Sequence, residues 1–356
     1  MRSSSMELRV TMGGTGRQAA LAAGLQALIA ERESPAGGGA LTVVIDPDAL
    51  ERALAAEAPR VAAYVPSLTG AWEGSLAEAE RVFVPHAAAV ETVVMRGAAR
   101  HRVEVIGPVA PRGFSPVDDR SETRRRLELA DVDRPAVVVE ARALAALDLS
   151  SALVQLSLVR TNAVWLFDVD HEPQLAERLR DLVPGYGLDA WMFANDDERD
   201  PLVWGGADLV LGRLEGLTPL LGAAVGASVV ATPPRREDVR AAHRLESTGA
   251  LEIVDAPATL AVTLDARLTP EKLAEGQEGS LALGAEGAAV RLVERLFALV
   301  EGTEAAPLGL PAGLERLSRR EDRRAGSPPS SGTGGAPDLD SRVDEELEAL
   351  RKRLGL

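Results

Sequence analysis

The sequence lacks cysteine, which excludes disulfides, thiolate metal sites, iron–sulfur clusters and cysteine nucleophiles. Histidine is also scarce: there are four, with no pair at the spacing of metal ligands, so we expect neither a metal site nor a cofactor. Aromatic residues make up 3%, so the core must consist mainly of alanine, valine and leucine. No run of 18 apolar residues and no apolar signal segment occurs, which predicts a cytoplasmic protein without a transmembrane span.

Basic charge is also in short supply. The 39 lysines and arginines face 54 aspartates and glutamates, and the formal net charge is −15. A nucleic-acid-binding protein needs a basic surplus to contact phosphates, so we expect no nucleic-acid partner. The 356 residues are 46% hydrophobic, which is typical of a globular chain with about two domains.

Short apolar runs alternate with helical patterns along most of the chain. The runs predict strands at 8–12, 41–45, 61–65, 82–84, 103–106, 136–139, 164–167, 191–194, 207–211, 229–231 and 251–254. Helical spacing predicts helices at 19–30, 48–58, 86–97, 121–129, 153–159, 172–182 and 290–300. This alternation predicts an α/β fold with parallel sheets covered on both faces.

Composition divides the chain into five predicted segments. They are an N-terminal domain (1–107), a crossing rich in proline and glycine (108–120), a C-terminal domain (121–300), a flexible linker (301–340) and a short helix (341–356). The last helix carries an apolar stripe of Val343, Leu347, Leu350 and Leu354. An apolar stripe on a tethered helix has to be buried against something, so we expect it to dock on a protein partner.

The clearest candidate ligand site is the first glycine turn, Gly13-Gly14-Thr15-Gly16, between a strand and a helix. Glycines let the backbone approach a ligand, and the helix start offers unpaired N–H groups to an anion. The pattern Gly14-x-Gly16-x-x-Ala19 also fits a dinucleotide site. However, the next acid after a strand, Asp46, lies 27 residues beyond Ala19, where that fingerprint expects about 20.

With the segments that follow it, this turn resembles the first loop of GT-B glycosyltransferases. The similar enzymes include the peptidoglycan GlcNAc transferase that makes lipid II and the monogalactosyldiacylglycerol synthases. The similar segments are residues 79–86, 102–114, 207–211 before Gly216-Leu217-Thr218, and 226–251. The resemblance implies a GT-B fold with two Rossmann-like domains: the N-terminal domain holds the acceptor, and the C-terminal domain holds a nucleotide sugar without a metal.

Several positions depart from the family pattern. Where the family loop continues Gly-His, with the histidine as candidate base, this chain has Arg17-Gln18. The family's second glycine loop is replaced by a segment that begins with Glu140, and its ribose-binding glutamate by Leu221. Glutamine takes up no proton at neutral pH, and leucine accepts no hydrogen bond. The family's polar pair falls on Arg236 and Arg240, which could hold a phosphate together.

These departures predict a GT-B-like protein in which nucleotide-sugar transfer is weak or lost, acting as a binding or scaffolding module. The ligand candidates are Gly13, Gly14, Thr15, Gly16, Gly216, Leu217, Thr218, Arg236 and Arg240, with a nucleotide sugar or another phosphate as ligand. One alternative is an active UDP-sugar hexosyltransferase with a lipid or cell-envelope acceptor. Another is an NAD-binding Rossmann enzyme that uses Gly14 and Gly16.

Overall fold

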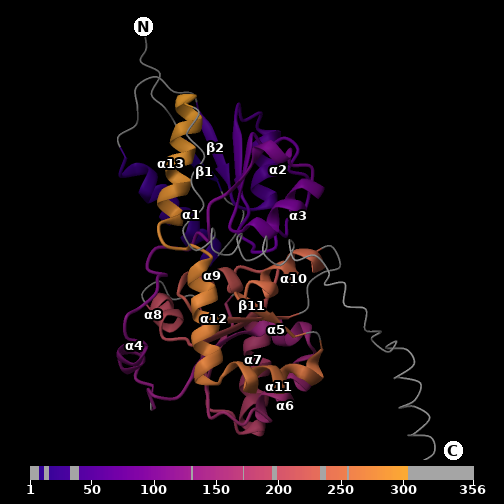
Figure 1. The fold of residues 1–356 in the computed structure, drawn as a ribbon, viewed down its shortest axis with the longest axis vertical. Helices are drawn as coiled ribbons and strands as arrows, with labels where there is room; N and C mark the ends of the chain where they lie inside the picture. The colour runs from indigo at the N-terminus through magenta and orange to yellow at the C-terminus, as the bar shows by residue number, and fades with distance from the viewer. Residues whose placement is uncertain are drawn as a thin grey trace, which may run out of the picture. The chain divides into compact units, whose positions relative to one another are not determined.

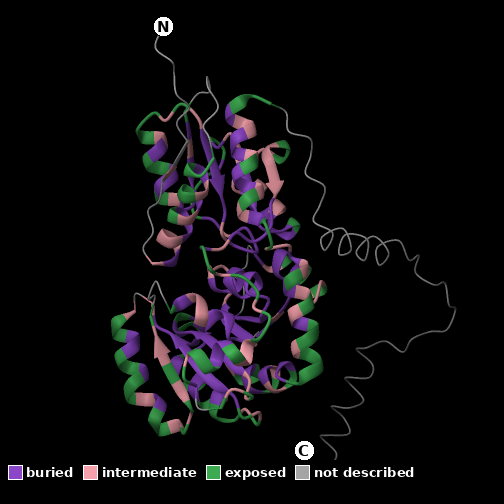
Figure 2. Ribbon diagram, turned by 90° about the vertical axis from the view of Figure 1, so that its left-hand side faces the viewer, coloured by how far each residue is buried: buried purple, intermediate pink, exposed green. Residues whose placement is uncertain are grey.

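The computed structural model describes residues 8–11, 16–32, 40–129, 131–170, 172–194, 199–232, 238–254 and 256–303. These residues form two parallel sheets with helices on both faces, which confirms the predicted α/β fold (Figure 1). Figure 2 shows the strands buried at the centre and the exposed residues on the outer surfaces of the helices. The predicted docking helix, with Val343, Leu347, Leu350 and Leu354, lies outside the described residues.

The first sheet has five strands in sequential order. They are β1 (Leu8–Thr11), β2 (Leu41–Val44), β3 (Val61–Tyr64), β4 (Arg81–Val84) and β5 (Val103–Val105), and each pairs in parallel with the next. The helices of this part are α1 (Arg17–Ala30), α2 (Pro47–Ala55) and α3 (Val90–Met95), with short 3₁₀ turns η1 (Ala87–Ala89) and η2 (Arg100–Arg102). The strand order does not reverse anywhere among the described strands of this sheet.

The second sheet has six strands in the order β11-β10-β9-β6-β7-β8. The strands are β6 (Ala136–Glu140), β7 (Val164–Asp168), β8 (Ala190–Phe193), β9 (Leu209–Arg213), β10 (Ser228–Thr232) and β11 (Leu251–Ile253). This is the order of a doubly wound nucleotide-binding sheet, and the direction reverses between β6 and β9. Ligands of such sheets bind in the crevice at the carboxyl ends of the two strands that flank the reversal.

The second part of the chain supplies the remaining helices. They are α4 (Arg120–Arg126), α5 (Ala141–Ala146), α6 (Leu149–Ser157), α7 (Pro173–Leu182), α8 (Asp200–Gly205), α9 (Thr218–Ala224), α10 (Val239–Ser247), α11 (Leu260–Arg267), α12 (Pro270–Ala282) and α13 (Ala288–Glu301), with 3₁₀ turns η3 (Val183–Tyr186) and η4 (Pro257–Thr259). No helix among the described residues is both long and apolar enough to cross a bilayer.

The first sheet contains an unusual connection. The chain steps from β1 to β2 and from β2 to β3 in the same direction, but α1 packs with Val43 on one face and α2 with Val44 on the other. Two connections with the same direction on opposite faces have opposite hands. The segment before β4 and helix α3 also pack on the α2 face. Because nearly all parallel connections are right-handed, β1–α1–β2 is the exception.

The last described helix, α13, returns to the first sheet, where it lies beside α1 (Figure 1). Its buried side chains, including Leu292 and Leu296, belong to the same apolar cluster as Leu21 and Leu25 of α1. Arg295 of the same helix donates to Glu104 of β5 at 2.6 Å. The apolar stripe of α13 therefore completes the core of the first sheet.

Candidate functional site

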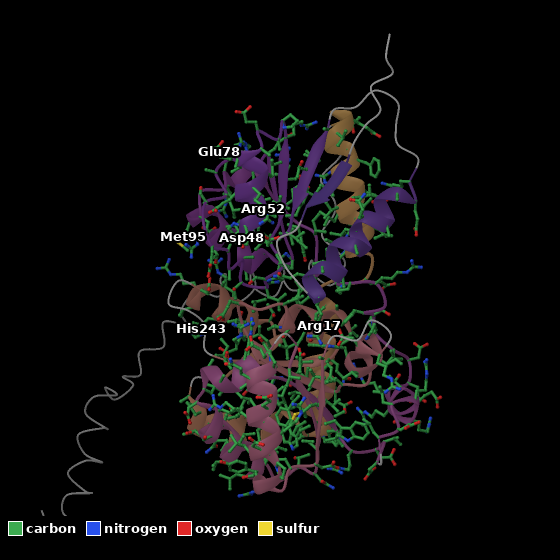
Figure 3. The ribbon with its side chains drawn as sticks, turned by 180° about the vertical axis from the view of Figure 1, so that it is seen from behind. Arg17, Asp48, Arg52, Glu78, Met95 and His243 are labelled. Carbon is green, nitrogen blue, oxygen red and sulfur yellow. The ribbon has the colours of Figure 1, made fainter. Side chains whose placement is uncertain are left out.

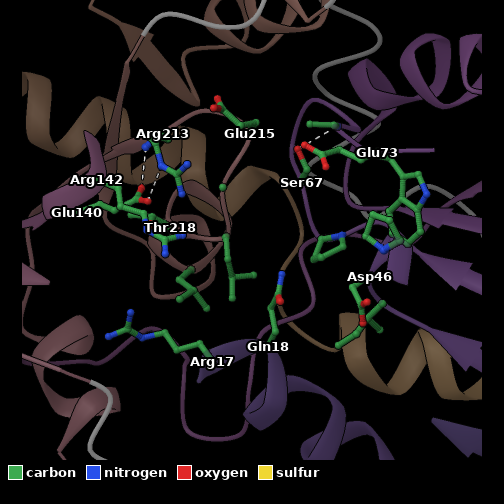
Figure 4. Close-up of a pocket in the computed structure, with 18 of the residues that line it drawn as sticks. Arg17, Gln18, Asp46, Ser67, Glu73, Glu140, Arg142, Arg213, Glu215 and Thr218 are labelled. Atoms are coloured by element: carbon green, nitrogen blue, oxygen red, sulfur yellow. Dashed lines mark hydrogen bonds and ion pairs between the residues drawn. The ribbon is translucent and has the colours of Figure 1, made fainter. Parts of the chain in front are cut away.

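A cavity of about 620 Å³ lies between the first and second sheets. Its first wall comes from the ends of β2 and β3 and the segments after them, and its second wall from the ends of β6, β7 and β9 (Figure 4). Asp46, Asp168 and Asp170, which follow predicted strands, all line it. Asp46 also begins α2, since its carboxylate accepts a hydrogen bond from the Ala49 amide at 2.8 Å.

The described lining is strongly acidic. It contains nine carboxylates and three guanidinium groups. The carboxylates are those of Asp46, Asp48, Glu51, Glu73, Glu140, Asp168, Asp170, Glu172 and Glu215, and the guanidinium groups are those of Arg17, Arg142 and Arg213. Each guanidinium group already bonds a carboxylate of the chain: Arg17 bonds Asp168, Arg142 bonds Glu172, and Arg213 bonds Glu140. The described wall therefore presents little positive charge to an anion.

The switch point of the second sheet is occupied by two of these side chains. Glu140 ends β6 and Arg213 ends β9, the strands that flank the reversal. One carboxylate oxygen of Glu140 accepts a hydrogen bond from the Arg213 amide and the other from its Nε, both at 2.8 Å (Figure 4). Glu140 is 8% exposed and the Arg213 side chain is 27% exposed, so the carboxylate is buried in the crevice and the guanidinium group is partly open to the cavity.

The turn after β9 closes tightly around this pair. A Cβ added at Gly216 would lie 3.7 Å from a carboxylate oxygen of Glu140, and one at Gly212 would lie 2.5 Å from Cγ2 of Thr218. Gly216, Leu217 and Thr218 all line the cavity. Gly212 therefore makes room for the methyl group of Thr218, whereas a side chain at Gly216 would make an ordinary contact with Glu140.

Gly16, the last residue of the first glycine turn, precedes α1 with a φ of 61°, in the region that favours glycine. The next residue, Arg17, is only 7% exposed and reaches across to the second sheet (Figure 3). Its Nε and Nη2 donate to the two oxygens of Asp200, each at 2.7 Å, and its Nη1 donates to Asp168 at 2.5 Å.

The protonation of this cluster is set by burial and by the opposite charges. Burial lowers the pKa of Arg17, but its hydrogen bonds and its attraction to Asp200 and Asp168 outweigh that effect and raise the pKa above the ordinary value. For Asp168, burial dominates and raises the pKa to about 6, although Arg17 acts in the opposite direction.

Gln18 and Leu221, two positions where the resemblance to GT-B enzymes implies functional groups, are among the described residues that line the cavity. Gln18 lines the cavity where those enzymes have a histidine. No histidine is among the described lining residues, and His86 is buried, with a pKa that burial lowers to about 4. Leu221, where the resemblance implies a ribose-binding glutamate, is buried in the core of the second sheet at the wall of the cavity. Among the described residues, no group of three acidic or histidine side chains could hold a metal ion.

The remaining predicted ligand residues divide into two groups. Arg240 is exposed near the start of α10 and is absent from the cavity wall. The others, Gly13, Gly14, Thr15 and Arg236, lie outside the described residues. Sequence reasoning missed Asp200 and Arg213, which complete the two ion pairs. The end of a strand, a position where ligand-facing residues gather, could have pointed to Arg213.

No protein-family model matches the chain, and no curated protein matches it. The chain does match solved structures. The chain has the GT-B fold. MurG from Acinetobacter baumannii aligns over 84% of this chain and 100% of its own, with a TM-score of 0.54 and 12% identity. A glycosyltransferase from Rickettsia africae aligns over 83% and 98%, with a TM-score of 0.53 and 13% identity. HepE from Anabaena in complex with UDP aligns over 79% and 82%, with a TM-score of 0.51 and 13% identity.

Proposed function

We propose that this chain is a GT-B-fold binding or scaffolding module in which nucleotide-sugar transfer is weak or lost. The observation that supports it is the Glu140–Arg213 pair in the switch-point crevice of the second sheet. A nucleotide in a doubly wound sheet binds at that crevice, because backbone amides at the strand ends are there to receive its phosphates. In this chain the Arg213 amide donates to Glu140 instead.

Charge supports the same conclusion. Two like charges 4 Å apart repel each other by about 4 kcal/mol at an effective dielectric constant of about 20. A diphosphate beside Glu140 would therefore either displace the carboxylate from Arg213 or bear that repulsion. In an active transferase, donors on the protein stabilise the leaving diphosphate, and a base takes the acceptor proton. The described wall offers paired arginines and Gln18 at these positions.

Calorimetric titration with UDP, UDP-GlcNAc, UDP-galactose and UDP-glucose tests the proposal. We expect no binding at micromolar concentrations and no hydrolysis of the sugar donors. Glu140→Gln should raise the affinity for UDP roughly tenfold, about 1.4 kcal/mol, because it removes the charge at the crevice. Glu172→Gln is the matched control, since it removes a charge from the same cavity wall away from β6 and should change the affinity less. Micromolar binding or turnover by the unmodified chain would overturn the proposal.

The cavity itself supports the second candidate, an active UDP-sugar transferase with a lipid or cell-envelope acceptor. A volume of about 620 Å³ is within the range of small-molecule sites, and Gly216 and Thr218 line it. In this version Arg236 and Arg240 bind the diphosphate. Donor hydrolysis that depends on both arginines would favour this candidate over the first.

The third candidate, an NAD-binding enzyme that uses Gly14 and Gly16, has less support. Dinucleotides bind where the strand order reverses, and β1 pairs only with β2 among the described strands of a sheet without a reversal. An increase in NADH fluorescence on mixing with the chain would favour it.

The C-terminal stripe of Val343, Leu347, Leu350 and Leu354 fits the scaffolding role, because a tethered amphipathic helix can dock on a partner. Deleting residues 338–356 should remove specific proteins from an affinity pull-down performed with the cytoplasmic fraction. An unchanged set of captured proteins would contradict the docking role and leave the proposal about the cavity intact.

A further inference from the structure

A second built site lies beside the cavity, at the ends of β7 and β8 and the start of α8. We call it the guanidinium seat, and it consists of Asp168, Phe193, Asp200 and Trp204. We infer that this seat is a binding site for a guanidinium group, that Arg17 is its internal ligand, and that the contact latches the two sheets in one orientation. This inference goes beyond the proposed function and does not depend on it.

The geometry of the seat matches the planar guanidinium group, whose N–H donors have fixed directions. Both oxygens of Asp200 accept from Arg17, one from Nε and one from Nη2, and each distance is 2.7 Å. A third bond, 2.5 Å long, joins Nη1 to Asp168. Two parallel bonds to one carboxylate require the fixed donors of arginine, which the single ammonium of lysine cannot reproduce.

Aromatic rings and second contacts complete the seat. The guanidinium carbon of Arg17 lies 5.2 Å from the ring centre of Trp204 and 5.8 Å from that of Phe193, within cation–π range. The indole N–H of Trp204 donates to Asp200 at 3.1 Å, which fixes that carboxylate. The second sheet therefore supplies charge, shape and orientation, and the first supplies only the guanidinium group.

The position of Arg17 makes this contact a latch. Arg17 is the first residue of α1, so its backbone belongs to the first sheet, while every group of the seat belongs to the second. Arg17, Asp168 and Asp200 are 7%, 5% and 2% exposed. Because desolvation offsets much of the attraction in a buried ion pair, its clearest contribution is to select one geometry.

A separate apolar contact also joins the two parts. Leu68 and Ala88 of the first part pack in one buried cluster with Leu220 and Leu245 of the second. Breaking the latch should therefore let the two parts reorient about this contact and leave them associated. This outcome distinguishes a latch from a contact that merely stabilises the fold.

Electron-spin distance measurement on the full chain tests the latch. The chain has no cysteine, so Met95→Cys and Val262→Cys add two unique attachment points for nitroxide labels. These residues lie in the first and second parts and are 67% and 72% exposed. With Arg17 present we expect one narrow distance, and with Arg17→Ala a broader distribution or an additional distance.

Chemical rescue tests the seat itself. Ethylguanidinium at millimolar concentration replaces the group that Arg17→Ala removes, so it should restore the narrow distance, whereas ethylammonium should not. The distance distribution of Arg17→Lys should also stay broad, because a lysine ammonium cannot form the two parallel bonds to Asp200. Arg32→Ala is the matched control. Arg32 follows the same α1 but pairs with Glu294 of α13, which packs on the first sheet, so its loss should leave the distance unchanged.

Two outcomes would overturn the inference: a folded Arg17→Ala chain that keeps the single narrow distance, or equal rescue by ethylammonium. If Arg17→Ala fails to fold, Arg17→Gln combined with Asp200→Asn keeps hydrogen-bonding groups, removes the charges of the Arg17–Asp200 pair and leaves Asp168 as the one buried carboxylate of the seat. We expect this chain to show the broad distribution and no response to ethylguanidinium. A narrow distance in that double variant would also overturn the latch.

Discussion

The two sheets of the GT-B fold differ in strand order. The second keeps the full doubly wound order with its reversal between β6 and β9, while the first runs sequentially and has no reversal among its described strands. However, the second sheet fills its own crevice with Glu140 and Arg213, and Arg17 of the first part bonds carboxylates of the second. The second sheet thus combines the strand order of a ligand-binding sheet with a carboxylate and a guanidinium group of the chain at its switch point.

The largest effect that would test this comparison is expected for Arg17→Ala. The variant leaves Asp168 and Asp200 buried without their partner, so the free energy of unfolding should fall by about 3–5 kcal/mol in urea denaturation. Arg32→Ala, which removes an exposed pair, should cost less than about 1 kcal/mol. Equal losses in the two variants would mean that the two parts do not depend on this contact.

The strand positions of both sheets were predictable from the sequence, but only the strand order of the second sheet was. The strands of the first sheet coincide with the predicted apolar runs within one residue and those of the second within two, and the order of the second follows a common rule of α/β folds. The sequential order of the first sheet and the return of α13 depend on pairing between distant segments, which periodicity does not encode. The predicted helix at 86–97 is divided into η1 and α3, because the His86 side chain accepts from the Ala88 amide and begins a 3₁₀ turn.

The site was predictable only in part, for a similar reason. Residue type alone indicated that Gln18 and Leu221 cannot replace a base and a ribose ligand. The pairing of Arg17 with Asp200 spans 183 positions and follows from how the two sheets face each other. No local pattern around Asp200 predicts this pairing, since an acidic residue before a proline is typical of any helix start.

The next largest expected effect concerns how the free energy of unfolding changes with pH, which should differ between the two parts. His86 in the first part has a pKa lowered to about 4 by burial, so the folded state favours its neutral form. The stability that this preference supports is present above the ordinary histidine pKa near 6.5 and is lost as the pH falls toward 4. His86→Asn keeps an acceptor for the Ala88 amide and should remove that loss, at most roughly 3 kcal/mol.

Asp168 in the second part should respond in the opposite direction. Burial raises its pKa to about 6, so the folded state binds its proton more readily than the unfolded state, and stability falls as the pH rises from about 4 to about 6. The groups that face it are Arg17 of α1, Asp200 of α8, Asp170 after its own strand and Glu140 on the adjacent strand.

Single variants should reveal two slopes that partly cancel in the unmodified chain. Between pH 4 and pH 6, the difference in unfolding free energy between Asp168→Asn and the parent chain should increase with pH, and that between His86→Asn and the parent should decrease. Urea denaturation at half-unit pH steps measures both differences. Two differences that change in the same direction with pH would contradict the assignment of opposite titrations to the two parts.

The smallest expected effect separates the crevice from the outer surface of the second part. Arg240 is exposed and absent from the described cavity wall, so Arg240→Ala should change the unfolding free energy by less than about 0.5 kcal/mol. If Glu140 closes the crevice, this variant should show no detectable binding of UDP, as in the parent chain. The combination Glu140→Gln with Arg240→Ala is decisive, because a diphosphate held by Arg240 would lose the affinity that Glu140→Gln gains. An undiminished gain would place any residual phosphate contact at the strand ends, in agreement with a crevice whose own carboxylate excludes the ligand.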